Sequence, residues 1–199
     1  MVRLTYENIY SNAESISTYL SINDNERPIT SLPMHYSFGL SVINSHLIKG
    51  ATILLTKSSL IERDFWSFLQ NYKATSLSGI PYSFEILKKI HFFKMDLPHL
   101  KTLNQAGGKL NDNLNLEFSK FCKKTARRFF VMYGQTEATA RISYLPYEHS
   151  VTKLGSIGKA IPGGDLYLID EKGNIIDGPE IEGELVYKGN NVSMGYATN

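Results

Sequence analysis

The alternation of two kinds of segment constrains the fold of this chain most strongly. Between residues 6 and 133, short apolar runs rich in branched side chains alternate with stretches whose apolar residues recur at helical spacing. The short runs are typical of buried strands, and the longer stretches are typical of helices that cover a sheet. Strand and helix taken in turn predict an α/β fold, with a mainly parallel sheet flanked by helices.

The expected elements can be placed along the chain. The first helix runs from about residue 6 to residue 20, with Thr5 as its cap and Glu7 near its positive end. Further helices are expected at about 40–48, 61–72, 81–90 and 114–124. Strands are expected at 28–32, 52–55, 74–78, 100–104 and 129–132, the second of them fully buried. Two helical stripes are expected to face the core: Leu40, Ile43, Leu47 and Ile48 in one, and Ile61, Phe65, Phe68, Leu69 and Tyr72 in the other.

The residue pattern of the sequence changes after residue 137. Glycine and proline punctuate short apolar runs there, a pattern typical of hairpins in a small antiparallel β subdomain. Two of these runs, 166–169 and 184–187, are expected strands. We therefore predict an α/β subdomain over residues 1–147 and a β-hairpin or barrel-like subdomain over residues 148–199.

Composition excludes several classes of protein. A formal net charge of +2 is too mild to predict a nucleic-acid partner, and the cations of residues 123–128 suit the solvated end of a helix. Cys122 is the only cysteine, so no intramolecular disulfide can form, and it suits a small buried side chain better than a reactive thiol. We expect a cytoplasmic protein with no secretory signal and no membrane span.

The five residues from Tyr133 to Glu137 include side chains suited to several different contacts with a nucleotide. A strand that ends there would present an aromatic ring for base stacking and a glycine that lets the backbone approach a ligand. Thr136 and Glu137 would then face phosphate and a divalent metal. The same residues also suit a plain strand-to-turn corner, with a half-buried tyrosine and a solvated glutamate.

Other segments accompany this motif, in a fixed order along the chain. They are Leu32–Leu40, Ala106–Leu110, Gly183–Leu185 and Gly195–Tyr196. Together with the Tyr133 motif they resemble the adenylate-forming, or AMP-binding, superfamily of acyl-CoA synthetases, luciferases and adenylation domains. The resemblance implies the central part of the family's large N-terminal domain, with loops for an acyl group and for adenine in residues 1–147 and an incomplete barrel in residues 148–199.

The resemblance implies roles for particular residues. Tyr133 would stack on adenine, Thr136 would contact the α-phosphate of ATP, and Glu137 would hold Mg²⁺. His35 would line the acyl pocket and orient the acid rather than transfer a proton. The alternative is a structural histidine whose hydrogen bonds are made within the core. The implied nucleotide-binding residues are Gly107, Gly108, Lys109, Tyr133, Gly134, Gln135 and Thr136.

The implied activity is that of an acid-thiol ligase. A carboxylic acid and ATP would give an acyl-adenylate, and the acyl group would then pass to a thiol of coenzyme A or of a carrier protein. No aspartate occurs between Leu32 and Gly50, which favours an uncharged acyl or aryl acid over an amino acid. Lys109 departs from the family pattern after the Gly-Gly turn, and its side chain could reach solvent or a substrate carboxylate. Glu184 is expected to be structural.

The resemblance covers only the middle of a family member. The phosphate-wrapping loop that would precede Val2 and the lysine-bearing domain that would follow Tyr196 are not in this sequence. We therefore expect a fragment of an enzyme that is inactive alone and that can self-associate through uncovered apolar surface. The alternative is a non-catalytic nucleotide-binding or interaction module with the same fold.

Overall fold

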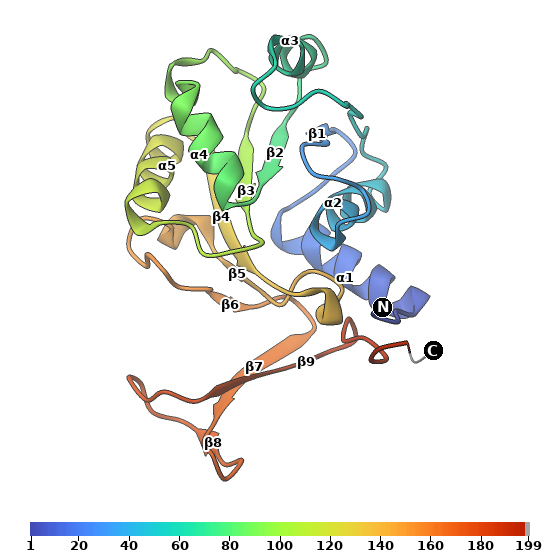
Figure 1. Cartoon of the computed structure of the whole chain (residues 1–199), viewed down its shortest axis with the longest axis vertical. Coiled ribbons are helices and arrows are strands. Elements are labelled where there is room, and N and C mark those ends of the chain that lie inside the picture. Colours follow the sequence, from blue (N-terminus) through green and yellow to red (C-terminus); the bar gives the residue numbers. More distant parts are fainter. Residues whose placement is uncertain (198–199) are drawn as a thin grey trace.

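The computed structural model describes residues 1–197 and contains two sheets. The larger sheet has six strands in the order β1 to β6, and Figure 1 shows it running through the middle of the molecule. Strands β1 to β4 are parallel, whereas β5 and β6 join the sheet antiparallel. The strands are β1 (Pro28–Ile29), β2 (Ser76–Gly79), β3 (Thr102–Gln105), β4 (Arg128–Tyr133), β5 (Ser143–Leu145) and β6 (Lys159–Ala160). The predicted α/β class with a mainly parallel sheet is confirmed.

Helices cover both faces of this sheet. Figure 1 shows α1 and α2 on one side and α4 and α5 on the other, and each pair buries a separate apolar cluster against the strands. Phe130 and Met132 of β4 contact the first pair, whereas Phe129 contacts the second, because successive strand residues point to opposite faces. The helices are α1 (Tyr6–Tyr19), α2 (Ser37–Leu47), α3 (Arg63–Asn71), α4 (Pro81–Lys89) and α5 (Asp112–Lys124).

The ends of the helices follow from local chemistry. Thr5 and Asn8 form a reciprocal capping box at the start of α1, as the side chain of each accepts from the backbone N–H of the other. Pro81 occupies the first turn of α4, where its missing N–H costs nothing. Cys122 is buried in α5, as expected for a small packing side chain, and desolvation raises the pKa of its thiol to about 12.

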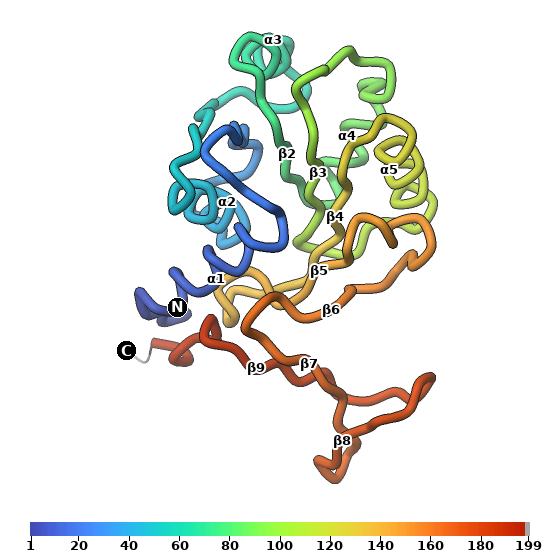
Figure 2. The backbone as a smooth tube through the Cα atoms, turned by 180° about the vertical axis from the view of Figure 1, so that it is seen from behind, coloured from blue at the N-terminus to red at the C-terminus, as the bar shows by residue number. Residues whose placement is uncertain are grey.

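A three-stranded antiparallel sheet follows, in the order β8-β7-β9. Its strands are β7 (Gly164–Ile169), β8 (Ile175–Ile176) and β9 (Glu184–Gly189). Figure 2 shows this sheet projecting from the larger one, after which the chain returns beside α1. The predicted antiparallel β part is confirmed. The sheets change between β6 and β7, so β6, which lies beyond the predicted division at residues 147 and 148, still belongs to the larger sheet.

Two sequence expectations about strands need correction. Residues 52–55 do not form a fully buried strand: only Leu54 makes a β-bridge, to Ile29, and Leu55 is 61% exposed. The segment lies outside β1, at the edge of the sheet, so it has a partner on one side only. The strand expected at 28–32 is reduced to two residues, Pro28 and Ile29.

Two expected apolar stripes also differ from the structure. In α2 the side toward the core carries Phe38 and Val42 together with small and polar residues, whereas Leu40, Leu47 and Ile48 are exposed. The polar residues tolerate burial because Ser41 and Ser45 donate to carbonyls one turn back in the helix. In the next stripe Phe65 and Leu69 are buried, whereas Ile61 and Tyr72, which lie just outside α3, are exposed.

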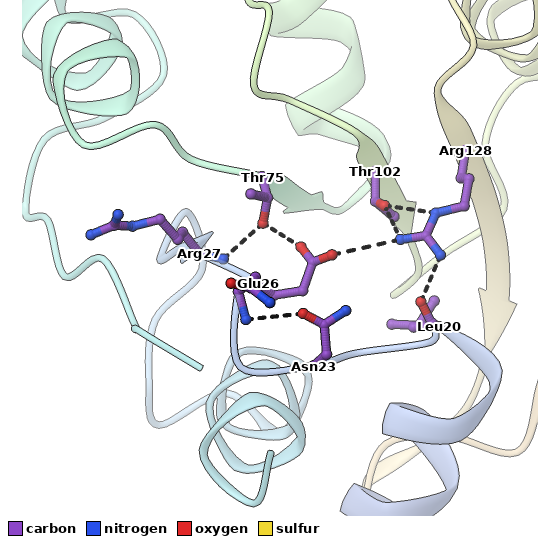
Figure 3. A network of polar contacts seen from close by, with 8 residues as sticks. Leu20, Asn23, Glu26, Arg27, Thr75, Thr102 and Arg128 are labelled. Carbon is purple, nitrogen blue, oxygen red and sulfur yellow. Dashed lines mark hydrogen bonds and ion pairs between the residues drawn. The ribbon is translucent and has the colours of Figure 1, made fainter. Parts of the chain in front are cut away.

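A polar network closes the amino end of the parallel strands, as Figure 3 shows. Glu26 is buried and accepts a hydrogen bond from the Thr75 hydroxyl, and its carboxylate lies 4.0 Å from the Arg128 guanidinium. Arg128 also donates to the Leu20 carbonyl at 2.8 Å and to the Thr102 hydroxyl at 2.8 Å. The network ties the end of α1 to the amino ends of the four strands β1 to β4. Within residues 1–197, no helix combines the length and apolar character that crossing a bilayer requires.

Candidate active site

The candidate site lies at the opposite, carboxyl end of the parallel strands. Ligands collect at this end of open α/β sheets because loops from several strands meet there. Three loops approach one another: the loop between β1 and α2, the Gly-Gly turn after β3, and the Tyr133 motif after β4. These are the loops that the sequence predicts to carry the chemistry.

The Gly-Gly turn is shaped by its backbone. Gly107 and Gly108 have φ values of +78° and +150°, a region that residues with side chains rarely adopt. Gln105 donates to the Gly108 carbonyl at 2.8 Å and holds the turn against the end of β3. A Cβ atom on Gly107 would lie only 2.6 Å from the Tyr36 hydroxyl, so the turn and the loop after β1 are already in contact.

The Tyr133 motif continues directly from β4. Tyr133 is 37% exposed at the end of the strand, and a short 3₁₀ helix over Thr136–Ala138 follows. A Cβ atom on Gly134 would lie 1.9 Å from the Ala140 carbonyl oxygen, so only glycine allows the chain to fold back so tightly. Antiparallel pairing of β4 with β5 then fixes the motif from its far side.

The Gly-Gly turn and the first two residues of the Tyr133 motif, Tyr133 and Gly134, line one cavity of about 280 Å³. The other residues of the motif, Gln135, Thr136 and Glu137, do not line it. Lys109 also lines it, and its side chain is exposed. This position is compatible with both expected roles, contact with solvent and contact with a substrate carboxylate. The remaining lining residues are Gln105, Leu110, Val131, Met132, Gly155, Ser156 and Ile157. The cavity thus combines an aromatic side chain with four glycines, which suits a flat aromatic ligand.

A larger hollow of about 610 Å³ lies beside the carboxyl end of α5 and the start of β4. Arg127, Arg128 and Tyr147 are among the residues that line it. We place the candidate site in the smaller cavity because strand-end loops and glycine turns converge there, whereas none of these loops reaches the larger hollow.

Thr136 and Glu137 are held by neighbours distant in sequence. The Thr136 and Ser37 hydroxyls lie 3.1 Å apart, which joins the motif to the start of α2. The Tyr196 hydroxyl donates to Glu137 Oε1 at 2.7 Å, and the Ser193 N–H donates to the Glu137 carbonyl at 2.7 Å. The hydrogen bond from Tyr196 lowers the pKa of the Glu137 carboxyl, so this group is a carboxylate at neutral pH.

The residues present fit a nucleotide with Mg²⁺. Mg²⁺ in nucleotide sites is commonly bound by one or two carboxylates together with substrate phosphates, and Glu137 supplies one ionised carboxylate. No group of three or more His, Cys, Asp or Glu residues that could hold a metal occurs within residues 1–197. His35 is exposed in the loop after β1 and does not line the 280 Å³ cavity.

Sequence analysis gave no role to three residues that the structure brings to this end of the sheet. Tyr36 and Ser37 lie inside a motif that was recognised, and only their contacts with Gly107 and Thr136 reveal them. Arg141 follows the Tyr133 motif and is 2% exposed. A charged residue between small and apolar neighbours was the available signal for Arg141.

Comparison with known proteins adds a family to this geometry. Residues 1–197 match the family described as AMP-binding enzyme. Luciferin 4-monooxygenase of Nipponoluciola cruciata is 31% identical over 208 residues, which cover 100% of this chain and 36% of that protein. A 2-succinylbenzoate–CoA ligase of Bacillus cereus is 29% identical over 98% of this chain and 39% of the ligase.

A solved structure agrees with these matches. O-succinylbenzoate coenzyme A synthetase from Bacillus subtilis, in complex with ATP and magnesium ion, superposes with a TM-score of 0.85 at 25% identity. The superposition covers 98% of this chain and 39% of the synthetase. The chain therefore spans less than two fifths of the length of these relatives.

Proposed function

Because this chain belongs to the AMP-binding enzyme family, we propose that it forms the nucleotide- and acid-binding core of an AMP-forming acid-thiol ligase. The observation that carries the proposal is the cavity shared by the Gly107-Gly108 turn and the Tyr133 motif. The family's relatives include CoA ligases, and the synthetase of similar fold was solved with ATP and magnesium. These matches support ATP and Mg²⁺ as the reagents here.

The cavity suits the adenosine part of ATP. The half-exposed ring of Tyr133 offers a stacking face, while Gly107, Gly108 and Gly134 keep side chains away from the ligand plane. Gln135 follows at the end of the strand and is exposed toward solvent. Adenine would therefore lie between the turn after β3 and the end of β4.

The proposed first step joins two anions. A carboxylate oxygen of the acid forms a bond to the α-phosphorus of ATP, and the bond to the bridging oxygen breaks, so pyrophosphate leaves with the electron pair. Bound Mg²⁺ would supply charge neutralisation in this step. Thr136 can donate a hydrogen bond from its hydroxyl to an α-phosphate oxygen, and Glu137, held by Tyr196, offers the carboxylate ligand.

The second step passes the acyl group to a thiol of coenzyme A or of a carrier protein. The sulfur forms a bond to the acyl carbon, the bond to AMP breaks, and the thiol proton goes to solvent. His35 remains a proposal for orienting the acid, and its exposed position allows an approach from the loop after β1. Lys109, at the edge of the cavity, is a proposed contact of the nucleotide or of the acid.

We propose that catalysis belongs to a longer protein and that the isolated chain only binds. The matched relatives are more than twice as long as this chain, and positioning of the triphosphate supplies much of the rate in such reactions. The exposed Leu40, Leu47 and Ile48 of α2 support self-association of the chain when it stands alone. Size-exclusion chromatography across concentrations tests that association, and a constant monomer would contradict it.

AMP titration by isothermal calorimetry tests the nucleotide site. We expect the chain to bind AMP and Tyr133→Ala to bind at least about ten-fold more weakly, because a base loses its stacking partner. Tyr82→Ala is the matched control, since Tyr82 is an exposed tyrosine on α4 outside the cavity. Equal AMP affinity in all three proteins would overturn the proposal. ATP–pyrophosphate exchange by the longer protein, absent from the isolated chain, tests the catalytic part.

A further inference from the structure

One edge of the larger sheet is open within the part of the chain that the structure describes. Residues 52–56, between α2 and α3, run beside β1, and Figures 1 and 2 both show this stretch at the outer margin of the molecule. The Leu54 N–H and carbonyl bond to backbone groups in and next to β1, at 2.9 and 3.0 Å. The Thr52 N–H donates to the Glu26 carbonyl at 3.2 Å. The even-numbered residues of the stretch therefore face β1.

The odd-numbered residues of the stretch turn their backbone groups away from the sheet, because these groups alternate along a strand. Among residues 1–197, the N–H and carbonyl groups of Ile53 and Leu55 make no backbone hydrogen bond. Such a row of free groups is a template for another strand, and proteins commonly protect it with charged residues or proline. Residues 51–56 include neither. This edge is thus open to pairing.

Apolar side chains border the open edge. Leu54 points into the apolar cluster on the α4 and α5 side of the sheet, so Ile53 and Leu55 point to the opposite face, where α2 packs. Leu55 is 61% exposed, and Leu47 at the end of α2 is 57% exposed. The edge therefore offers apolar contact as well as hydrogen bonds.

From this geometry we infer that residues 52–56 pair with the same residues of a second copy of this chain, as antiparallel strands that join the two larger sheets. The inference rests on the self-association proposed above and gives it a location. A two-fold axis at Leu54 would put Ile53 of each copy opposite Leu55 of the other. Such a pair exchanges both of its N–H···O bonds, so every outward N–H and carbonyl is used. The pattern of free groups is complementary to itself.

The charges near the edge favour this antiparallel register. Lys57 is the only charged residue between positions 51 and 57, and it would lie opposite Ala51 of the other copy. A Cβ atom on Gly50 would lie 3.8 Å from the Cβ atom of Asp24, whose side chain is exposed. Lys57 of each copy would thus approach Asp24 of the other. A parallel pairing in register would instead bring the two Lys57 side chains together.

Two variants at one position separate backbone pairing from apolar contact. Leu55→Ala loses the side chain but keeps the N–H, whereas Leu55→Pro also loses the outward N–H. Proline removes no bond to β1, because the even-numbered residues make those bonds. Sedimentation equilibrium should show dimerisation at least about ten-fold weaker in Leu55→Pro than in Leu55→Ala, since each copy loses a donor. Equal dimerisation constants would overturn the inference.

Disulfide formation tests the register without relying on proline. Thr52 of one copy would lie opposite Thr56 of the other, in a pair without hydrogen bonds whose Cα atoms are about 4.5 Å apart. Within one extended strand the two positions are about 13 Å apart, so they cannot link internally. The double variant Thr52→Cys with Thr56→Cys should therefore form covalent dimers under oxidation, whereas neither single variant should. The native Cys122 is buried in all of them.

The outcomes distinguish the inference from the proposals on which it builds. A unaltered chain that remains monomeric at every concentration would overturn the inference and the proposed self-association together, and would leave the edge to a strand of another protein. Dimers that persist in Leu55→Pro and do not cross-link in the double cysteine variant would overturn the inference alone. AMP titration of the same proteins reports separately on the nucleotide site, because the open edge lies outside the 280 Å³ cavity.

Discussion

At the amino end of the parallel sheet, Arg128 faces the buried Glu26 and donates to Thr102 and to the Leu20 carbonyl. At the carboxyl end, Arg141 is more deeply buried, yet it has no carboxylate partner within residues 1–197. Arg128 has a buried carboxylate partner, whereas Arg141 has none among the described residues and packs on the Phe38 ring. The amino end contributes stability, while the carboxyl end retains an unfavourable charge of the kind that proteins keep at functional sites.

The two ends also differ in how their backbone is fixed. Side-chain hydrogen bonds from Thr75 and Arg128 tie the amino end together. At the carboxyl end, Gly107 and Gly134 let separate segments approach more closely than any side chain would allow. Substitutions should therefore act through lost partners at the first end and through steric conflict at the second.

The largest effect is expected from Gly134→Ala. The new methyl group would lie 1.9 Å from the Ala140 carbonyl oxygen, and the β4–β5 connection would have to shift, at a cost of about 3 kcal/mol in unfolding free energy. Urea denaturation measures this loss. Gly163→Ala is the control, because no atom lies within 4 Å of its new methyl group and only a left-handed backbone cost of about 1 kcal/mol remains. Equal losses would show that the tight turn is not the constraint.

Arg128→Met and Arg141→Met compare the two ends directly. We expect Arg128→Met to lower the unfolding free energy by about 2 kcal/mol, because it leaves the buried Glu26 carboxylate without a cationic partner and the Leu20 carbonyl without its donor. Arg141→Met should cost less, since it removes an uncompensated buried charge and leaves an apolar side chain among aromatic rings. Urea denaturation measures the loss of unfolding free energy in both variants. A larger loss for Arg141→Met than for Arg128→Met would contradict the difference between the two ends.

His46 should make the amino end sensitive to acid. Burial lowers the pKa of His46, although its contacts with the Val42 carbonyl and Glu26 oppose the shift. The unfolded chain therefore takes up a proton first, and stability falls as the pH drops below about 6.5, by at most about 1.4 kcal/mol per pH unit. Urea midpoints at several pH values measure the slope. His46→Gln should flatten it, and parallel curves would exclude this histidine as the cause.

Tyr196→Phe should have the smallest effect on stability and a local effect on ionisation. The Tyr196 hydroxyl donates to Glu137, and both side chains reach solvent, so the urea midpoint should not change measurably. Loss of that donor should raise the pKa of the Glu137 carboxyl toward its ordinary value. A ¹³C NMR titration of Glu137 in both proteins shows the shift. An unchanged pKa would mean that Tyr196 does not hold this carboxylate.

Sequence analysis identified the α/β class, the antiparallel β part and the family because these depend on local pattern. The alternation of strand and helix is visible in apolar spacing, and the Gly-Gly turn and Tyr133 motif keep a recognisable order. The orientation of α2 could not be found in this way. Its buried face contains only two large apolar residues, Phe38 and Val42, beside Ser41 and Ser45, whose hydroxyls are satisfied inside the helix. The exposed leucines and isoleucine therefore gave the stronger apolar stripe and pointed to the wrong side.

The sequence predicted those site residues that lie together in one short motif, but not the contacts between distant segments. The end of β4 and the Gly-Gly turn line one cavity, as expected for loops at the carboxyl ends of strands. The contacts of Thr136 with Ser37 and of Glu137 with Tyr196 join residues 99 and 59 positions apart. Such pairs depend on tertiary packing and leave no local signal. The roles of His35, Lys109 and Gln135 remain predictions.

The return of the chain after β9 has a kinetic consequence. Asn191 donates to the carbonyls of Ala138 and Arg141, 53 and 50 positions earlier, and Asn8 donates to the Asn190 carbonyl across 182 positions. Contacts of such long sequence separation form slowly, because a large loop must close first. We therefore expect the Tyr133 motif to be completed late in folding, after the parallel strands, and pulsed hydrogen exchange should show its amides gaining protection after those of β2 and β3.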